Sequence, residues 1–493
     1  MRGAWVVLIL VGGITAQGAT GQQGARGAGE QGARSATGAW GARGATGATG
    51  ATRARGAAES AQSPKAAARR GIVRGDGHAF VDDGGPFLAR GATLFWALWG
   101  YQHDRERLGR NLSTLRGWGF DYIRVLGVVG APGEHPGPVC GPNVSGCDSW
   151  RDRRLDPEAA SYAQDVAGFT DWAFKEYGLR VQWTIFGGTE FTPTVDARRA
   201  VVEKFARMAR GREAAIFAFE IANESWQNGF PGEEGKRELH ALAKVLKAGS
   251  SNLVALSSPE NGSCEGAQAL YRDSVADLAT LHIGRVGTAR GENWTALRHV
   301  WALHSCTGIP ALRSSNEPIG PESSVAGMDD PVALSTMALV TYGSGIGAFV
   351  LHTGPGVRGG GEADLVRGRH RNLWELPTVD RIAAGLSNIT RLIPGDFANW
   401  STQDELGAAA ERLFDVKNRT DVAGVYCFAK NQDFACAPVG IKQPLSLVAR
   451  RRMTISLHPL LSAAAAASRS LAPGAVLSIP AAHPALLIRG RLN

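Results

Sequence analysis

Eight times between residues 87 and 390, a short apolar run is followed by a longer segment of helical period. The runs have the length of strands and are apolar throughout, as expected of strands buried on both faces of a parallel sheet. Eight such units close naturally into a (β/α)8 barrel, the fold that we predict for residues 71–392. The predicted strands are 87–98, 121–130, 179–188, 215–224, 252–261, 277–285, 309–318 and 345–354.

A doubly wound open sheet is the alternative arrangement for the same alternation. Such a sheet usually carries a Gly-rich phosphate loop after its first strand. Here "ALWGYQHD" (97–104) follows the first strand and lacks that pattern, so the barrel is favoured. No Cys-x-x-Cys or histidine cluster has zinc-ligand spacing, and we expect neither a metal nor another cofactor.

The barrel is predicted to have structured segments on both sides. "GIVRGDGHAFVDDGGPFLA" (71–89) is typical of an entry hairpin before the first strand. After Pro394 the pattern changes to short strand-like runs, among them "DVAGVYCFA", "RMTISL" and "PALLIRG". These runs predict a small β domain, similar to a β-sandwich, over residues 393–493.

Residues 1–19 have the pattern of a secretory signal peptide, with a basic residue, an apolar core and small residues near Ala16 to Ala19. The apolar core is too short to span a bilayer, and no later segment is apolar for long enough. We therefore expect a secreted or extracellular protein without a membrane span.

A tail over residues 20–70 has glycine at nearly every third position as far as Gly56. It is either a flexible spacer or a collagen-like stalk, although its phase slips and it has no proline before Pro64. Only a trimerising tail would make the protein an oligomer. Residues 1–70 hold nine basic and two acidic residues, so nearly all of the net charge of +8 belongs there. A basic globular surface for nucleic acid is not supported.

Six cysteines in an exported chain permit three disulfides. Two pairs are close in sequence, Cys140 with Cys147 and Cys427 with Cys436. Cys264 and Cys306 remain, and they lie on neighbouring units of the predicted barrel, so a third bridge is expected between them.

Two of the predicted strands end in the dipeptide Asn-Glu. "FAFEIANESW" places Asn223 and Glu224 at the end of the fourth strand, and "ALRSSNEPIGP" places Asn316 and Glu317 at the end of the seventh. The chemistry of a (β/α)8 barrel occurs at the carboxyl ends of its strands, and these two ends face each other across the mouth. Two opposed carboxyl groups are the minimal equipment for cleaving a glycosidic bond.

These motifs resemble clan A of the glycoside hydrolases, in particular the cellulase-like family five, from about residue 72 to residue 390. "FEIANES" is similar to the strand-four motif with its acid/base glutamate, and "SSNEP" stands at the strand-seven nucleophile. "GFDYIRVLG" resembles strand two, whose Arg124 would hold the nucleophile ionised. The resemblance implies that Glu224 is the general acid/base and Glu317 the nucleophile.

The two roles could be exchanged, because Asn-Glu-Pro is typical of the acid/base in this clan. Counting opposes that assignment, since three predicted strands precede Glu224 and four follow it. Glu224 must be protonated when substrate binds, so burial and the opposing charge should raise its pKa. Asn223 either binds the 2-hydroxyl group of the sugar or serves to form the turn.

Further candidates for the sugar site lie at strand ends: His282 and His352, and the tryptophans Trp96 and Trp226, with Trp99 beside them. His282 could orient the nucleophile and His352 could bond a hydroxyl group, or either could be an ordinary loop or core histidine. The clan often has His-x-Tyr on strand six and a tryptophan after strand eight, whereas this chain has "LHIG" and "FVLHTG". Aromatic faces stack on sugar rings, which suggests that role for the tryptophans. The long insertions 131–156 and 355–378 are expected to form walls of the cleft.

Side-chain alternation along the strands predicts one further contact. Glu220 shares parity with Glu224, and Arg313 shares parity with Glu317, so both should point into the barrel. A buried Glu220–Arg313 ion pair is therefore expected, because an unpaired charge there would be very costly.

Together these features predict a secreted retaining glycoside hydrolase that acts on a β-linked polysaccharide or oligosaccharide. Two alternatives remain open. The chain could be a sugar-binding barrel that has lost catalysis, or a structural or adhesive surface protein in which the Gly-rich tail is the functional part.

Overall fold

The computed structural model describes residues 71–130, 153–260, 262–283, 300–318, 320–323, 329–359, 369–405, 412–419, 423–440, 443–462, 467–481 and 485–493. The predicted signal peptide, the Gly-rich tail and the Cys140–Cys147 pair lie outside these ranges. Most of the predicted insertion at 131–156 and part of that at 355–378 also lie outside them.

The centre of the fold is a parallel eight-stranded sheet in the order β8-β7-β6-β5-β4-β11-β10-β9. Each predicted strand run contains one of its members, which confirms the (β/α)8 barrel. The strands are β4 (Ala89–Thr93), β5 (Tyr122–Val128), β6 (Arg180–Phe186), β7 (Ile216–Ala222), β8 (Val254–Ala255), β9 (Leu278–Leu281), β10 (Leu312–Ser315) and β11 (Ala348–Leu351). All of their residues are buried, as the continuous apolar runs predict.

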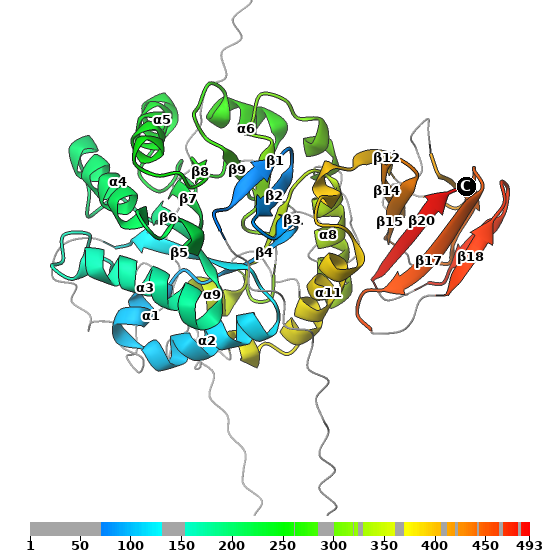
Figure 1. The fold of residues 1–493 in the computed structure, drawn as a ribbon, viewed down its shortest axis with the longest axis horizontal. Coiled ribbons are helices and arrows are strands. Elements are labelled where there is room, and N and C mark those ends of the chain that lie inside the picture. The colour runs from blue at the N-terminus through cyan, green and yellow to red at the C-terminus, as the bar shows by residue number, and fades with distance from the viewer. Residues whose placement is uncertain are drawn as a thin grey trace, which may run out of the picture. The chain divides into compact units, whose positions relative to one another are not determined.

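Helices connect successive strands and cover the outside of the barrel (Figure 1). They are α1 (Ala97–His103), α2 (Arg105–Gly117), α3 (Tyr162–Tyr177), α4 (Val195–Ala209), α5 (Gly232–Gly249), α6 (Cys264–Tyr271), α8 (Pro331–Gly343), α9 (Gly354–Arg358) and α11 (Val379–Leu392). Local signals set their ends: Thr194 caps α4 by accepting from the backbone N–H of Ala197, and Gly178 ends α3 at a φ of 67°. Among the helices of the described ranges, none is both long and apolar enough to cross a membrane.

The ring closes between β8 and β9 without a regular ladder, since these strands stand at the two ends of the hydrogen-bonded order. Asp277 bridges the gap: its N–H donates to the carbonyl of Val254 at 2.8 Å, and its carboxylate accepts from the N–H of Val254 at 3.0 Å. The hydroxyl of Tyr271 donates to the carbonyl of Ser257 at 2.7 Å and accepts from the N–H of Thr280 at 3.0 Å. We call this junction the seam.

A disulfide between Cys264 and Cys306 adds a covalent link beside the seam, because Cys264 begins α6 and Cys306 lies between β9 and β10. This pairing was predicted from the sequence and is confirmed.

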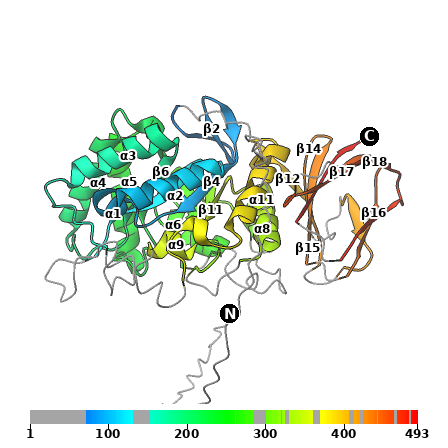
Figure 2. The same cartoon turned by 90° about the horizontal axis from the view of Figure 1, so that it is seen from below.

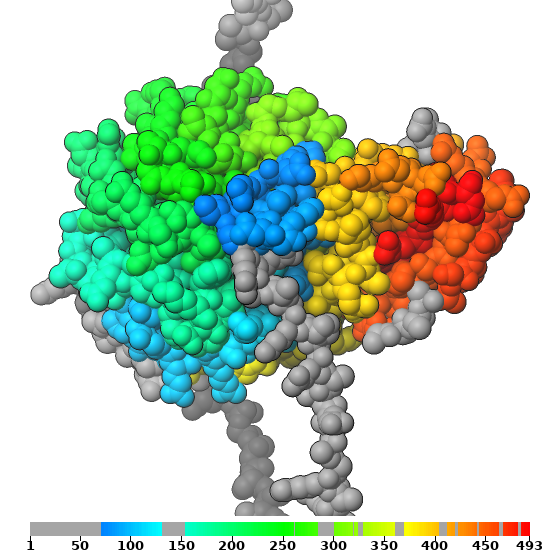
Figure 3. All heavy atoms as spheres, viewed as in Figure 1, coloured from blue at the N-terminus to red at the C-terminus, as the bar shows by residue number. Residues whose placement is uncertain are grey.

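An antiparallel hairpin of β1 (Arg74–Asp76), β2 (Ala79–Asp82) and β3 (Gly85–Phe87) precedes the barrel, as predicted. It packs against the amino-terminal ends of the strands, where Phe80 lies 5.0 Å from Phe217, ring to ring. Its Asp82 forms a fully buried ion pair with Arg180 at 3.0 Å. The hairpin covers the centre of this barrel face (Figure 3), and α9 lies on the opposite side (Figure 2).

The C-terminal region consists of antiparallel sheets, in agreement with the predicted β-sandwich-like region. A six-stranded sheet has the order β12-β14-β15-β20-β17-β18, and a three-stranded sheet has the order β13-β16-β19. The strands are β12 (Ser401–Glu405), β13 (Phe414–Val416), β14 (Gly424–Lys430), β15 (Asp433–Val439), β16 (Leu445–Ala449), β17 (Met453–Pro459), β18 (Ser468–Leu471), β19 (Val476–Ile479) and β20 (Leu486–Leu492).

Alternation along β14 divides its side chains between two cores. Val425 and Cys427 join the core shared by the two sheets, whereas Tyr426 and Phe428 join the core of the barrel. The predicted Cys427–Cys436 disulfide links β14 to β15 and is confirmed. Helix α8 packs against this sheet as well as the barrel, which accounts for its nearly complete burial.

Candidate active site

The two Asn-Glu dipeptides follow β7 and β10 at the carboxyl ends of the barrel strands. Glu224 lies two residues after the end of β7, and Glu317 lies two residues after the end of β10. His282 follows β9 directly, and His352 follows β11. The hairpin occupies the amino-terminal ends, so these side chains gather at the opposite end of the barrel.

The carboxylates of Glu224 and Glu317 come together around the imidazole of His282. One oxygen of each carboxylate and one ring nitrogen of His282 all lie within 4.8 Å of one another. Nδ1 of His282 lies 3.0 Å from Oε1 of Glu224, and Nε2 lies 3.5 Å from Oε1 of Glu317. The three side chains are 16%, 5% and 6% exposed for Glu224, Glu317 and His282, so the cluster is largely withdrawn from water.

Arg124 of β5 organises the floor of the cluster. Its Nη1 donates to Oε1 of Glu317 at 2.6 Å, and its Nη2 donates to Oδ1 of Asn223 at 2.7 Å. The same guanidinium donates twice to Oε2 of Glu220, at 2.8 and 3.0 Å. Burial alone would lower the pKa of Arg124, but the carboxylates of Glu220 and Glu317 outweigh burial and raise it. Arg124 is therefore a permanent positive charge beside Glu317.

The predicted Glu220–Arg313 ion pair is wrong. Arg313 points away from the barrel interior and donates to the backbone carbonyls of Leu303 and, at 2.8 Å, of Cys306. Strand β10 ends at Ser315, so Glu317 lies beyond the pleat and its parity does not extend back to Arg313. Burial lowers the pKa of Arg313 to about 10.

Glu220 is buried below the cluster and is fully engaged there. In addition to Arg124, it accepts from the hydroxyl of Thr184 at 2.6 Å and from the amide of Asn316 at 3.0 Å. Asn316, the other half of the second Asn-Glu pair, thus serves the floor of the site. No role was predicted from the sequence for Thr184 or Asn316, and the inward parity of Glu220 was the only sequence signal for this network.

Glu224 has a backbone conformation that is uncommon for its residue type, with a φ of 41°. The chain turns sharply here, because the N–H groups of Gln227 and Asn228 both donate to the carbonyl of Glu224 at 3.0 and 3.2 Å. The side-chain amide of Gln227 also donates to Oε2 of Glu224. The tight turn directs the carboxylate toward His282, and Gln227 is a contact that the sequence analysis missed.

The predicted aromatic residues differ in accessibility. Trp226, two residues after Glu224, is 41% exposed. Trp96 is only 1% exposed, and its indole N–H donates to the carbonyl of Pro355 at 3.0 Å. Trp99 is equally buried, so the positions of Trp96 and Trp99 do not support the predicted stacking on a sugar.

His352 lies under Glu317. Its Nδ1 is 2.9 Å from the hydroxyl of Thr93, and its Nε2 is 3.7 Å from Oε2 of Glu317. Glu317 is therefore approached by three basic side chains: Arg124 from within β5, and His282 and His352 from the ends of β9 and β11.

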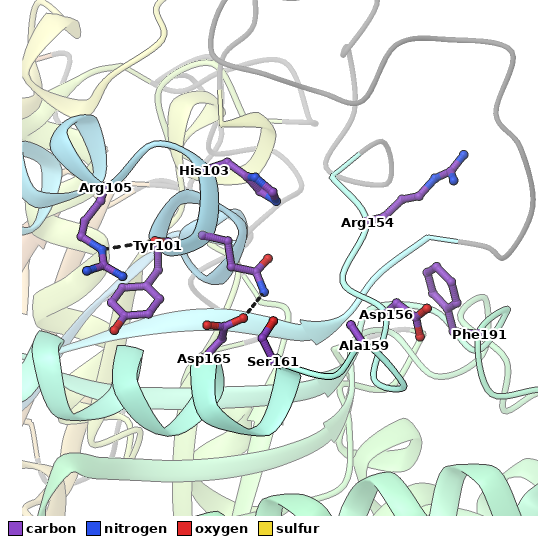
Figure 4. Close-up of a pocket in the computed structure, with 10 residues that line it drawn as sticks. Tyr101, His103, Arg105, Arg154, Asp156, Ala159, Ser161, Asp165 and Phe191 are labelled. Atoms are coloured by element: carbon purple, nitrogen blue, oxygen red, sulfur yellow. Dashed lines mark hydrogen bonds between the residues drawn. The ribbon is translucent and has the colours of Figure 1, made fainter.

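A separate pocket of about 710 Å³ lies among the connections that follow β4, β5 and β6 (Figure 4). Tyr101, His103, Arg154 and Phe191 line it. Gln102 and Asp165 also line it, and the amide of Gln102 donates to the carboxylate of Asp165 at 2.8 Å. The connections place it at the carboxyl end of the barrel, the same end as the carboxylate cluster. Neither Glu224 nor Glu317 lines it.

The eight-stranded parallel barrel has a clan A, cellulase-like fold, which it shares with solved glycoside hydrolases. The chain is similar to the crystal structure of a family 5 glycoside hydrolase from Bacteroides vulgatus, with a TM-score of 0.60 and 13% identity over 86% of this chain and 93% of that one. A second solved structure, named as a glycoside hydrolase, gives a TM-score of 0.60 and 14% identity over 86% and 97%. No family model and no curated protein matches the sequence.

Proposed function

We propose that this protein is a retaining glycoside hydrolase that cleaves a β-linked polysaccharide or oligosaccharide, with Glu224 as general acid/base and Glu317 as nucleophile. The observation that carries the proposal is the approach of the two carboxylates to within 4.8 Å. Retaining enzymes hold their carboxyl groups about 5–5.5 Å apart, whereas inverting enzymes need about 6.5–9.5 Å to admit a water molecule.

In the first step, Glu317 attacks the anomeric carbon and Glu224 donates its proton to the leaving oxygen. A glycosyl ester on Glu317 results, and the aglycone departs with the proton. In the second step, Glu224 takes a proton from water, which attacks the anomeric carbon and releases Glu317. Each step inverts the anomeric centre, so the product keeps the configuration of the substrate.

The surrounding side chains fit these roles. Arg124 favours the ionised form of Glu317, which a nucleophile requires. The amide oxygen of Asn223 already accepts from Arg124, which leaves its NH2 group to donate to the 2-hydroxyl of the sugar. The exposed ring of Trp226 beside Glu224 offers a stacking face on the leaving-group side. His352 lies 3.7 Å from Glu317 and, in this proposal, also contacts a hydroxyl group of the bound sugar.

The proposal includes secretion, as the N-terminal pattern predicts. Both disulfides of the described residues are consistent with an oxidising compartment, because such bonds are rare in the cytosol.

The decisive experiment measures hydrolysis of aryl β-glycosides and soluble β-glucans or mannans by wild type, Glu224→Gln and Glu317→Gln. We expect each variant to lose about 10²–10⁴-fold in kcat, as for loss of a catalytic proton donor or nucleophile. NMR of the first product should show the β anomer. Azide should rescue Glu317→Ala to an α-glycosyl azide and Glu224→Ala to a β-glycosyl azide.

Glu322→Gln is the matched control, because Glu322 lies after β10 like Glu317 but pairs with His370 at 2.6 Å. It should leave kcat within a few-fold of wild type. Retention on a polysaccharide without turnover would instead identify a sugar-binding barrel. Hydrolysis with inversion would exclude the assigned role of Glu317.

A further inference from the structure

We propose that the cluster of Glu224, His282 and Glu317 binds one divalent first-row transition cation, for which Zn²⁺ is the probe, in the protein without substrate. The cation is an inhibitor in this proposal, not a cofactor. Inhibition rests on the proposed function, whereas cation binding does not.

The donor set carries the proposal. Two carboxylates and one imidazole are ligands that zinc commonly takes in proteins, while the nitrogen ligand disfavours magnesium and calcium. The three residues extend from the ends of β7, β9 and β10, so a cation between them would be held from three separate strands. Their ligand atoms already lie within 4.8 Å of one another.

The distances need only small side-chain adjustments. Zinc bonds of about 2.0–2.1 Å place tetrahedral ligand atoms about 3.3 Å apart. A single cation would use one ring nitrogen: Nε2 of His282 already lies 3.5 Å from Oε1 of Glu317, whereas Glu224 contacts the other ring nitrogen, Nδ1, at 3.0 Å. Rotation of the Glu224 carboxylate, the more exposed of the two, is the adjustment that the site requires.

A second observation points to a ligand here. Nε2 of His282 is buried and makes no hydrogen bond within the described part of the chain. The side chain of His282 is only 6% exposed, and this nitrogen faces the carboxylate of Glu317 at 3.5 Å. A buried imidazole nitrogen that makes no hydrogen bond and faces a carboxylate is suited to a cation.

Charge also favours binding. The cluster holds two carboxylates, and Arg124 is shared between Glu317 and Glu220, so it does not neutralise both carboxylates of the cluster. A divalent cation would lower the repulsion between Glu224 and Glu317. It would occupy the space between the two groups that must reach the anomeric carbon, so sugar and cation would exclude each other.

The test is calorimetric titration of Zn²⁺ into the full chain, after treatment with a chelator. We expect one dominant site, with affinity at least tenfold lower in His282→Ala and in Glu224→Gln. Glu224→Gln keeps the shape of the side chain and is expected to fold. It therefore tests the proposal even if His282→Ala does not fold. Zn²⁺ should also raise the Tm of wild type more than that of either variant.

His370→Ala is the matched control, since His370 and Glu322 form another histidine–carboxylate pair after β10 and β11. It should bind Zn²⁺ as wild type does. Equal affinity in wild type, His282→Ala and Glu224→Gln, or loss of the site only in His370→Ala, would overturn the proposal. These measurements need no substrate, so a protein that hydrolyses no glycan can still pass or fail them.

Discussion

Glu220 is the residue on which the geometry of the carboxylate cluster depends, although it lies below the cluster. It holds Arg124 by two hydrogen bonds and thereby aims the remaining donors at Glu317 and Asn223. It is a positioning residue rather than a catalytic one. Its effect on chemistry should therefore appear in kcat and much less in KM.

We expect Glu220→Gln to lower kcat by about 10-fold or more and to destabilise the fold by about 3 kcal/mol, because one partner of a buried ion pair is lost. Steady-state kinetics and chemical unfolding measure both effects. Glu238→Gln is the control: Glu238 pairs with Arg198 through two hydrogen bonds away from the site. It should lower stability but leave kcat unchanged. Equal losses of kcat in both variants would argue against a positioning role.

Glu224 is strained by its own backbone, since a φ of 41° is unfavourable for residues other than glycine, asparagine and aspartate. Glu224→Asn should therefore be more stable than Glu224→Gln by about 1 kcal/mol. Thermal unfolding of the two variants at one pH measures the difference. A lower Tm for the asparagine variant would show that the side-chain contacts of Glu224 outweigh its backbone strain.

How far the site could be predicted from sequence differs between residues. The pairing of Glu224 with Glu317 follows from counting strands, because the carboxyl ends of parallel strands meet at one end of a barrel. The partner of Glu220 could not be predicted in this way. Side chains alternate between the two faces only inside a strand, and Glu317 lies past the end of β10, so its direction says nothing about Arg313. Burial of Trp96 depends on the chain after β11, which supplies the carbonyl of Pro355.

At the scale of elements, the seam between β8 and β9 is the part of the barrel with the fewest backbone links. Tyr271 replaces ladder hydrogen bonds there, and burial raises its pKa to about 12. Tyr271→Phe should destabilise the fold by about 1–3 kcal/mol, because the N–H of Thr280 and the carbonyl of Ser257 lose their partner. Chemical unfolding measures this loss.

The control is Tyr342→Phe, which removes a buried hydroxyl that donates to the carbonyl of Ala89 in β4. Hydrogen exchange should become faster in β8 and β9 for Tyr271→Phe, but not for Tyr342→Phe. Faster exchange spread evenly over the barrel in both variants would mean that the seam is not a local weak point.

The strands themselves were predictable because burial on both faces leaves a continuous apolar run in the sequence. Their ends were less so: the run 252–261 contains a strand of only two residues, Val254–Ala255. The residues that flank this strand, from Asn252 to Pro259, are buried as well, and hydrophobicity cannot distinguish them from the strand. The seam could not be predicted from the apolar pattern either, because it depends on the polar groups of Asp277 and Tyr271.

At the scale of the whole molecule, two histidines make stability depend on pH. Burial lowers the pKa of His78 and of His304 below the ordinary value of 6.5, and the positive charge of Arg313 acts in the same direction. Below about pH 6.5, the two histidines therefore bind more protons in the unfolded chain than in the folded chain. Their contribution to stability is complete above 6.5 and is lost as the pH falls through 6.5 toward the lower folded-state pKa values.

We expect a smaller free energy of unfolding at about pH 5 than at about pH 7.5, measured with urea. The double variant His78→Gln/His304→Gln should show a flatter dependence between these values. A dependence as steep as that of wild type would assign the effect to other groups.

The disulfide beside the seam affects the stage at which the closure of the barrel gains its covalent link. The parallel sheet holds seven adjoining strand pairs by hydrogen bonds, and its last junction relies on Asp277, Tyr271 and the neighbouring bond between Cys264 and Cys306. In a newly made chain kept among reducing thiols, the junction between β8 and β9 would have its hydrogen bonds but not its neighbouring disulfide. In the secreted protein that we propose, oxidation outside the cytosol would form this disulfide and so add the last link across the junction.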